Sequence, residues 1–182
     1  EMHDAISFRD ALSEGAQLVL PPVAISAADT AFLQYTGGTT GVAKGAVLTH
    51  RNVVANLLQL SAFWHGVFVP GREIMVTPLP LYHVFCLLCN CLLTVHNGGL
   101  AVLITNPRDI PAFVSELRKW RFTMITGVNT LFGALLDHPR FSRLDFSALK
   151  LGAAGGMALH ASVATRWQQV TGTPLVEGYG LT

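Results

Sequence analysis

The sequence predicts an α/β fold in which helices cover a mainly parallel sheet. From residue 31 onward, short apolar runs alternate with longer amphipathic runs, which is typical of strand–helix–strand units. Hydrophobic residues make up 51% of the 182 residues and charged residues only 13%, as expected for a sheet buried on both faces. Glycine-rich segments fall at the carboxyl ends of predicted strands, where sheets of this kind bind ligands.

The individual elements follow from this alternation. Strands are predicted at residues 31–35, 46–48, 74–77, 100–104, 122–125, 149–151 and 175–177. Helices are predicted at residues 52–64, 84–95, 111–120, 129–136 and 159–170. Thr49 and Asp109 can cap the helices that follow them, and Gly172 lies where the last helix should end. We interpret residues 1–30 as a lead-in segment and residues 31–182 as an incomplete α/β domain.

Composition and segment length argue against two classes of protein. A net charge of +1 provides no general basic field, so nucleic acid is not expected as a partner. The uncharged span 74–107 has its longest helical candidate at 81–95, shorter than the roughly 20 apolar residues of a membrane-spanning helix. The high hydrophobicity could instead serve another domain, an apolar substrate or peripheral contact with a membrane.

The cysteines and the N-terminal residues indicate a cytoplasmic setting. Cys86, Cys89 and Cys91 lie within one apolar stretch and are odd in number, so a disulfide framework is not expected. A metal site is the alternative, but no fourth ligand lies near them, which favours buried structural thiols. Residues 1–17 lack the basic and apolar segments of a signal peptide.

Residues 35–45 carry the sharpest signal for chemistry. Four glycines and three threonines precede or flank Lys44 directly after an apolar strand. Glycines let backbone N–H groups approach phosphate oxygens, while hydroxyls and an ammonium add donors and charge. No carboxylate occurs between Asp29 and Glu73, which favours an anion over a metal. The loop is not of the Walker A type, because Ala43 precedes the lysine. An ordinary flexible turn is the alternative.

Extended to Asn52, this string resembles the phosphate-loop signature of the adenylate-forming superfamily, which includes acyl-CoA synthetases, luciferases and peptide-synthetase adenylation domains. The version found here looks most like that of bacterial long-chain fatty acid–CoA ligases. The resemblance covers nearly the whole chain from Ala31 and includes the later segments 79–83, 105–109, 126–132 and 177–182.

The resemblance implies a two-step reaction that uses ATP, Mg²⁺ and CoA. A fatty acid carboxylate attacks the α-phosphate of ATP and gives acyl-AMP and pyrophosphate, and the CoA thiol then displaces AMP. Such chemistry needs charge stabilisation and alignment more than a protein nucleophile.

The resemblance also implies a role for each matching residue. The β- and γ-phosphates would be held by Thr36, Gly37, Gly38, Thr39, Thr40, Gly41 and Lys44. The adenine and α-phosphate would be bound by Gly155, Gly156, Glu177, Gly178, Tyr179, Gly180 and Thr182. Tyr179 would stack on adenine, Thr182 would reach the α-phosphate, and His83 would lie beside the reacting carboxylate, with Lys44 and Thr182 assisting catalysis. The alternatives are a core aromatic for Tyr179 and a structural histidine for His83, while His50 is expected to begin a helix.

Some parts of the family pattern would lie outside this chain. A Mg²⁺-binding glutamate is expected directly after Thr182, followed by a small C-terminal domain, so we expect the intact parent, not the fragment, to complete turnover. Phe85, Cys86 and Leu87 occupy the place of a gating tryptophan found in some relatives. Another carboxylic acid as substrate, a non-catalytic nucleotide- or acyl-binding module, and a homodimer stay open.

Overall fold

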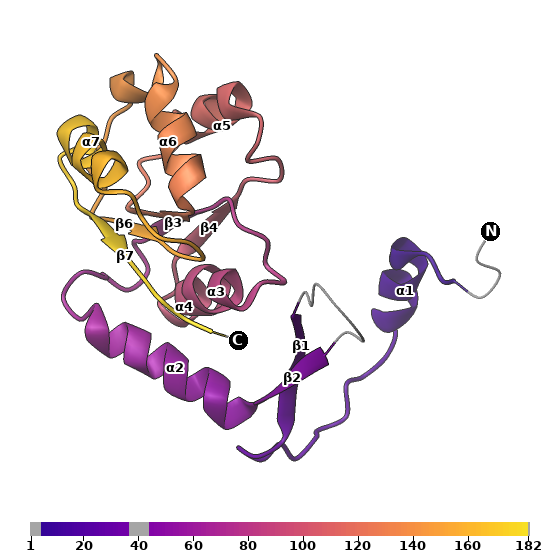
Figure 1. Cartoon of the computed structure of the whole chain (residues 1–182). Coiled ribbons are helices and arrows are strands. Elements are labelled where there is room, and N and C mark those ends of the chain that lie inside the picture. Colours follow the sequence, from indigo (N-terminus) through magenta and orange to yellow (C-terminus); the bar gives the residue numbers. More distant parts are fainter. Residues whose placement is uncertain (1–4, 37–43, 182) are drawn as a thin grey trace.

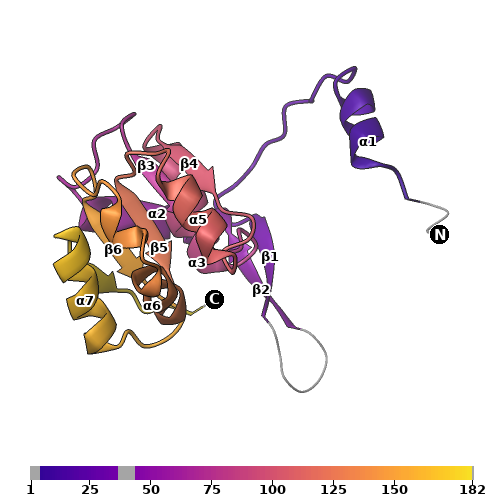
Figure 2. The same cartoon turned by 90° about the horizontal axis from the view of Figure 1, so that it is seen from above.

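A computed structural model describes residues 5–36 and 44–181 of the chain. It consists of a five-stranded sheet with helices on both faces, a separate two-stranded hairpin, and an N-terminal helix that stands apart from both (Figures 1 and 2). The predicted phosphate loop, apart from its ends, lies outside the described residues.

The lead-in segment contains a helix that the sequence analysis did not predict. α1 (Phe8–Gly15) begins after Ser7, whose side chain accepts a hydrogen bond from the Asp10 N–H. No residue of α1 is buried, and the helix lies away from the sheet in both views (Figures 1 and 2). Phe8 and Leu12 lie four residues apart, as on one face of a helix, and this signal was not used in the sequence analysis.

The hairpin consists of β1 (Thr30–Thr36) and β2 (Lys44–Thr49), which are antiparallel. Thr36 pairs with Lys44, so these two residues form the base of the predicted phosphate loop. The following helix, α2 (His50–Phe63), begins with a capping box in which Thr49 and Asn52 each bind the other's backbone N–H. The predicted cap at Thr49 and the helix start at His50 are both confirmed.

The main sheet is entirely parallel, with the strand order β4-β3-β5-β6-β7. Its strands are β3 (Ile74–Thr77), β4 (Leu100–Leu103), β5 (Met124–Gly127), β6 (Leu151–Ala154) and β7 (Leu175–Glu177). The predicted mainly parallel α/β fold is therefore confirmed. β5 and β6 begin two residues later than predicted and also end later, because Gly127 and the sequence Gly152–Ala154 are weak strand formers that pair only within the sheet.

Helices cover both faces of this sheet (Figure 1). One face carries α5 (Ile110–Leu117), α6 (Asn129–Asp137) and α7 (Ala161–Thr171), and a short 3₁₀ turn, η2 (Phe141–Arg143), follows α6. On the other face, Met75, Met124 and Leu151 pack against Trp64 and Phe68, just beyond α2. The predicted cap at Asp109 and the helix end at Gly172 are confirmed.

The predicted helix 84–95 is not a regular α-helix. It is divided into α3 (Val84–Cys86), a π-helical segment η1 (Leu87–Leu92) and α4 (Leu93–His96). Asn90 in η1 is completely buried and donates to the Val76 carbonyl at 3.3 Å and the Thr77 hydroxyl at 3.2 Å. Its carbonyl oxygen accepts a bond of 3.0 Å from the Thr126 hydroxyl. This buried amide therefore joins the helix to β3 and β5.

A buried ion pair lies at the amino edge of the sheet. The Lys150 ammonium lies 2.5 Å from the Glu73 carboxylate, whose side chain is only 3% exposed. The same carboxylate accepts a bond of 2.6 Å from the Val69 N–H, and Lys150 also donates to the Val67 carbonyl. Burial raises the pKa of the Glu73 carboxyl, but hydrogen bonds from Lys150, Thr123 and Val69 outweigh burial, so this pKa lies below its ordinary value.

Within the described ranges, the helices are all too short or too polar to traverse a lipid bilayer.

The Glu73 pair predicts an acid-sensitive contribution to stability. Lys150→Met should lower the free energy of unfolding by about 3 kcal/mol at pH 7, because it leaves a buried carboxylate without its cation. Since the folded-state pKa of Glu73 is depressed, the pair stabilises above the unfolded pKa and loses its effect as the pH falls through the folded value. The measurement is urea unfolding from pH 7 to pH 4.

Lys119→Met is the matched control, because Lys119 pairs with Glu116 at the surface with 63% of its side chain exposed. We expect it to change stability by at most about 0.5 kcal/mol. An equal loss in both variants, or a Lys150→Met loss that does not shrink toward acid pH, would contradict this interpretation.

The buried amide of Asn90 gives a second prediction. Asn90→Leu should lower the free energy of unfolding by about 1–3 kcal/mol, because the Val76 carbonyl and the Thr126 hydroxyl lose their partner without access to water. The exposed Asn106 serves as control, and Asn106→Leu should stay within about 0.5 kcal/mol of the wild type. The free energies of unfolding of both variants are measured by chemical denaturation. Equal stabilities of Asn90→Leu and Asn106→Leu would contradict the stabilising role of the buried Asn90 amide.

Candidate functional site

The carboxyl edge of the sheet brings three glycine-containing turns together. β5, β6 and β7 end at Gly127, Ala154 and Glu177, and their parallel register aligns these ends. Hydrogen bonding continues beyond the strands, because the Gly155 N–H donates to the Gly127 carbonyl at 3.0 Å and the Gly178 N–H donates to the Ala154 carbonyl at 2.8 Å. The predicted adenine segments 155–156 and 177–180 are therefore neighbours, as the resemblance implied.

Two of these positions require glycine for different reasons, close packing at Gly155 and backbone conformation at Gly156. A Cβ atom at Gly155 would lie 3.0 Å from the Phe85 ring and 3.4 Å from the Gly178 carbonyl oxygen. Gly156 has φ +77°, in the left-handed region that favours glycine. The Phe85 ring thus packs directly on the turn after β6, and this contact places the start of α3 at the carboxyl edge.

His83 lies at the start of α3, two residues before Phe85. Its Nδ1 accepts a hydrogen bond of 3.2 Å from the Phe85 N–H, so His83 is the N-cap of this helix. In the neutral ring the proton then resides on Nε2, which is the atom left to donate to a ligand. The imidazole is exposed. His83 therefore has a structural role as the N-cap of α3, and this role leaves Nε2 available to bind a ligand.

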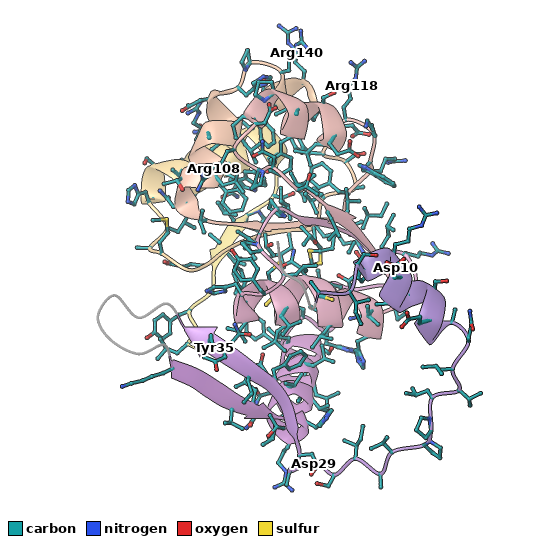
Figure 3. All side chains as sticks on the ribbon, turned by 90° about the vertical axis from the view of Figure 1, so that its right-hand side faces the viewer. Asp10, Asp29, Tyr35, Arg108, Arg118 and Arg140 are labelled. Atoms are coloured by element: carbon teal, nitrogen blue, oxygen red, sulfur yellow. The ribbon has the colours of Figure 1, made fainter. Side chains whose placement is uncertain are left out.

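The hairpin is attached to this same turn. The Gln34 side chain on β1 donates a bond of 2.7 Å to the Tyr82 carbonyl, next to His83. The base of the predicted phosphate loop, Thr36 and Lys44, lies at the end of that hairpin, and Lys44 is exposed. Figure 3 shows Tyr35 at the same end of the hairpin. The other predicted loop residues, Gly37, Gly38, Thr39, Thr40 and Gly41, lie outside the described residues.

The segment after β7 carries the predicted adenine-binding residues. Tyr179 is 90% exposed, so the alternative of a core aromatic is wrong. Gly178 and Gly180 flank it in the sequence. One oxygen of Glu177 accepts a bond of 2.9 Å from the Leu159 N–H, which leaves the second oxygen for a ligand. In Figures 1 and 2 this segment runs from β7 toward α3 and the hairpin. Thr182 lies outside the described residues.

Four residues that support the site escaped the sequence analysis. Gln34 and Asn90 are described above, and the buried Asn129 accepts a bond of 2.9 Å from the His160 N–H, which fixes the loop after Gly156 against α6. Thr126 completes the set through its bond to Asn90. Such residues can be recognised in the sequence as polar side chains within apolar runs, because buried amides and hydroxyls need hydrogen-bond partners.

Two of the three cysteines, Cys86 and Cys89, are buried. Burial raises the pKa of Cys86 to about 12 and that of Cys89 to about 11, so both remain thiols. The Cys86 thiol donates to the Leu79 carbonyl at 3.0 Å. The prediction of buried structural thiols is confirmed for these two residues, while Cys91 is half-buried. Over residues 5–36 and 44–181, no three His, Cys, Asp or Glu side chains gather as a metal site.

Known proteins with similar sequences and structures agree with this arrangement. The family model of the AMP-binding enzymes matches residues 3–182. A long-chain-fatty-acid–CoA ligase of Salmonella typhimurium is 58% identical over 179 residues, which are 98% of this chain and 32% of the relative. Among solved structures, apo MatB from Rhodopseudomonas palustris superposes with a TM-score of 0.78 at 27% identity, over 94% of this chain and 33% of that one.

The N-terminal domain of FACL13 from Mycobacterium tuberculosis shares the fold, with a TM-score of 0.79 at 24% identity over 94% of this chain and 42% of that one. The predicted resemblance to adenylate-forming enzymes is thereby confirmed. The chain spans about a third of the length of the curated relatives it matches, and it belongs to the family of AMP-binding enzymes.

Proposed function

We propose that the whole protein activates a long-chain fatty acid with ATP to acyl-AMP and then transfers the acyl group to CoA. The observation that carries this proposal is the carboxyl edge, where the turns after β6 and β7 meet the helix start at His83. The 58% identity to a relative named as a long-chain-fatty-acid–CoA ligase supports the substrate class.

ATP would lie across the ends of β6 and β7. The turn of Gly155 and Gly156, of which Gly156 is exposed, would lie on one side of the adenine, and the exposed Tyr179 ring would stack on the other. The second oxygen of Glu177, which does not bind the Leu159 N–H, would accept a hydrogen bond from the adenine amino group. The phosphates would extend toward the hairpin, where Thr36, Lys44 and the loop between them would bind the β- and γ-phosphates.

The first step requires alignment of three groups. A fatty acid carboxylate oxygen attacks the α-phosphorus, the bond to the bridging oxygen breaks, and pyrophosphate leaves. Lys44 would neutralise charge on the phosphates, and Thr182 would contact the α-phosphate. His83 would donate a hydrogen bond from its Nε2–H to the carboxylate and so orient it, since Nδ1 already accepts from the Phe85 N–H. In the second step the CoA sulfur attacks the acyl carbon and AMP leaves.

The acyl chain would lie along the apolar helix that begins after His83. Val84, Leu87 and Leu88 are half-buried there, and the neighbouring thiols of Cys86 and Cys89 are neutral, so an alkyl chain meets no buried charge on this segment. Mg²⁺ belongs to the proposed reaction through the family. The cytoplasmic location, membrane contact and homodimer stay predictions.

The proposed activity predicts acyl-dependent release of AMP. The whole protein with ATP, Mg²⁺ and CoA should release AMP with medium- and long-chain fatty acids and little with short, aromatic or amino acids. Turnover with only an aromatic or amino acid would retain adenylation and overturn the fatty acid assignment. Absence of AMP release with every acid tested would favour a non-catalytic binding module.

Tyr179 provides the variant for the same assay. Tyr179→Ala should raise the KM for ATP by about 5- to 100-fold, the range expected for one lost base–aromatic stacking contact. Tyr179→Phe keeps the ring and should stay near the wild type, and the KM for the fatty acid should change little in either variant. An unchanged KM for ATP in Tyr179→Ala would contradict the adenine assignment.

A further inference from the structure

Gln34 is a polar residue on the more buried face of the hairpin. Successive side chains of a strand point to opposite faces. On β1, Gln34 is half-buried, whereas its neighbours Leu33 and Tyr35 are 61% and 63% exposed. This reverses the usual pattern of a half-buried strand, in which apolar side chains face the core and polar ones face water. A polar side chain on the buried face needs a hydrogen-bond partner there.

The partner of Gln34 is the peptide group that precedes His83. The Gln34 amide donates to the Tyr82 carbonyl at 2.7 Å. The N–H of the same peptide group belongs to His83 and donates to the Pro80 carbonyl at 3.0 Å. Because a peptide group is planar, hydrogen bonds at both of its ends fix its orientation. The His83 ring is held separately by the Phe85 N–H, so backbone and side chain of this histidine are both fixed.

This hydrogen bond joins the hairpin to the rest of the candidate site. The hairpin lies outside the parallel sheet and near α3 (Figures 1 and 2). Over residues 5–36 and 44–181, no other hydrogen bond connects β1 or β2 to the parallel sheet or to the segment formed by α3, η1 and α4. The hydrogen-bonded connection between the hairpin and the turn that carries His83 is therefore one side-chain amide.

The same strand leads to the base of the predicted phosphate loop. Gln34 precedes Thr36 by two residues, which is about 7 Å along a strand, and Thr36 pairs with Lys44. Gln34 therefore lies between the residues that would bind the β- and γ-phosphates and the histidine that would orient the fatty acid carboxylate.

We propose that Gln34 is a positioning residue for the formation of acyl-AMP. It holds the phosphate-binding end of the hairpin and His83 at a fixed separation, so that the carboxylate oxygen meets the α-phosphorus opposite the departing pyrophosphate. This role rests on the proposed function, because it concerns the same two substrates. Gln34 itself transfers no proton and forms no covalent bond, and its uncharged amide leaves the charges of the phosphates and the carboxylate unchanged.

The test measures the two half-reactions of the whole protein separately in Gln34→Met, which keeps the length of the side chain and removes the donor. Acyl-AMP formation from ATP, Mg²⁺ and a long-chain fatty acid should be about 10- to 100-fold slower than in the wild type, because a misplacement of about 1 Å has an effect of this size. The KM values for ATP and the fatty acid should stay within about threefold, since the bond aligns the substrates more than it binds them.

The second half-reaction distinguishes positioning from general distortion. Thioester formation from supplied acyl-AMP and CoA should stay within about threefold of the wild type in Gln34→Met, because pyrophosphate has already left and the hairpin has no β- or γ-phosphate to align. A purely structural role for Gln34 would slow both half-reactions alike.

Gln59→Met is the matched control, because Gln59 is exposed on the neighbouring helix α2, and both of its half-reactions should stay within about twofold of the wild type. Gln34→Ser is too short to reach the Tyr82 carbonyl and should reproduce the result of Gln34→Met with a polar side chain. Thermal unfolding of each variant establishes that it is folded.

Two kinds of failure can be told apart. Equal losses in both half-reactions, or a rate of acyl-AMP formation in Gln34→Met equal to that of the wild type, would overturn the positioning role alone. A wild type that forms no acyl-AMP with any acid tested would overturn the proposed function, and the role of Gln34 with it.

Discussion

The parallel register of β5, β6 and β7 is the constraint on which the site depends. It aligns three strand ends at one edge, and the backbone hydrogen bonds from Gly155 to Gly127 and from Gly178 to Ala154 carry that alignment into the turns. The turns can approach one another because glycine leaves space, and the Phe85 ring occupies it above Gly155. The exposed backbone of Gly156 and the exposed Tyr179 ring remain at this edge, and together they are suited to a flat, polar base.

The helix layer and the hairpin are attached to this edge by a few specific contacts. Asn90 joins η1 to the ends of β3 and β5, and Gln34 joins β1 to the turn that carries His83. His83 itself caps α3 through Nδ1. These hydrogen bonds form without any ligand. They fix the groups that would contact the phosphates and the carboxylate in position relative to the turns that would bind adenine. Preorganisation of this kind lowers the cost of aligning reactants.

Sequence alone could predict the fold class and the order of the site segments, because strand–helix alternation and the glycine strings are local patterns. It also placed the caps at Thr49 and Asp109. It could not predict the π-helical segment around Asn90, whose geometry accompanies long-range bonds to β3 and β5. The position of β6 was predicted two residues too early for a related reason, since Gly152 and the alanines after it form a strand only when neighbouring strands pair with them.

The most direct test of this account is the structure of the whole protein with a non-hydrolysable fatty acyl-adenylate analogue. The account predicts that the adenine lies between the Tyr179 ring and the backbone of Gly155 and Gly156. It also predicts that the acyl carbonyl lies within hydrogen-bond distance of His83 Nε2 and that the alkyl chain follows α3 and η1. An analogue bound away from the carboxyl edge of the sheet, or an adenine without contact to Tyr179 and these glycines, would contradict it.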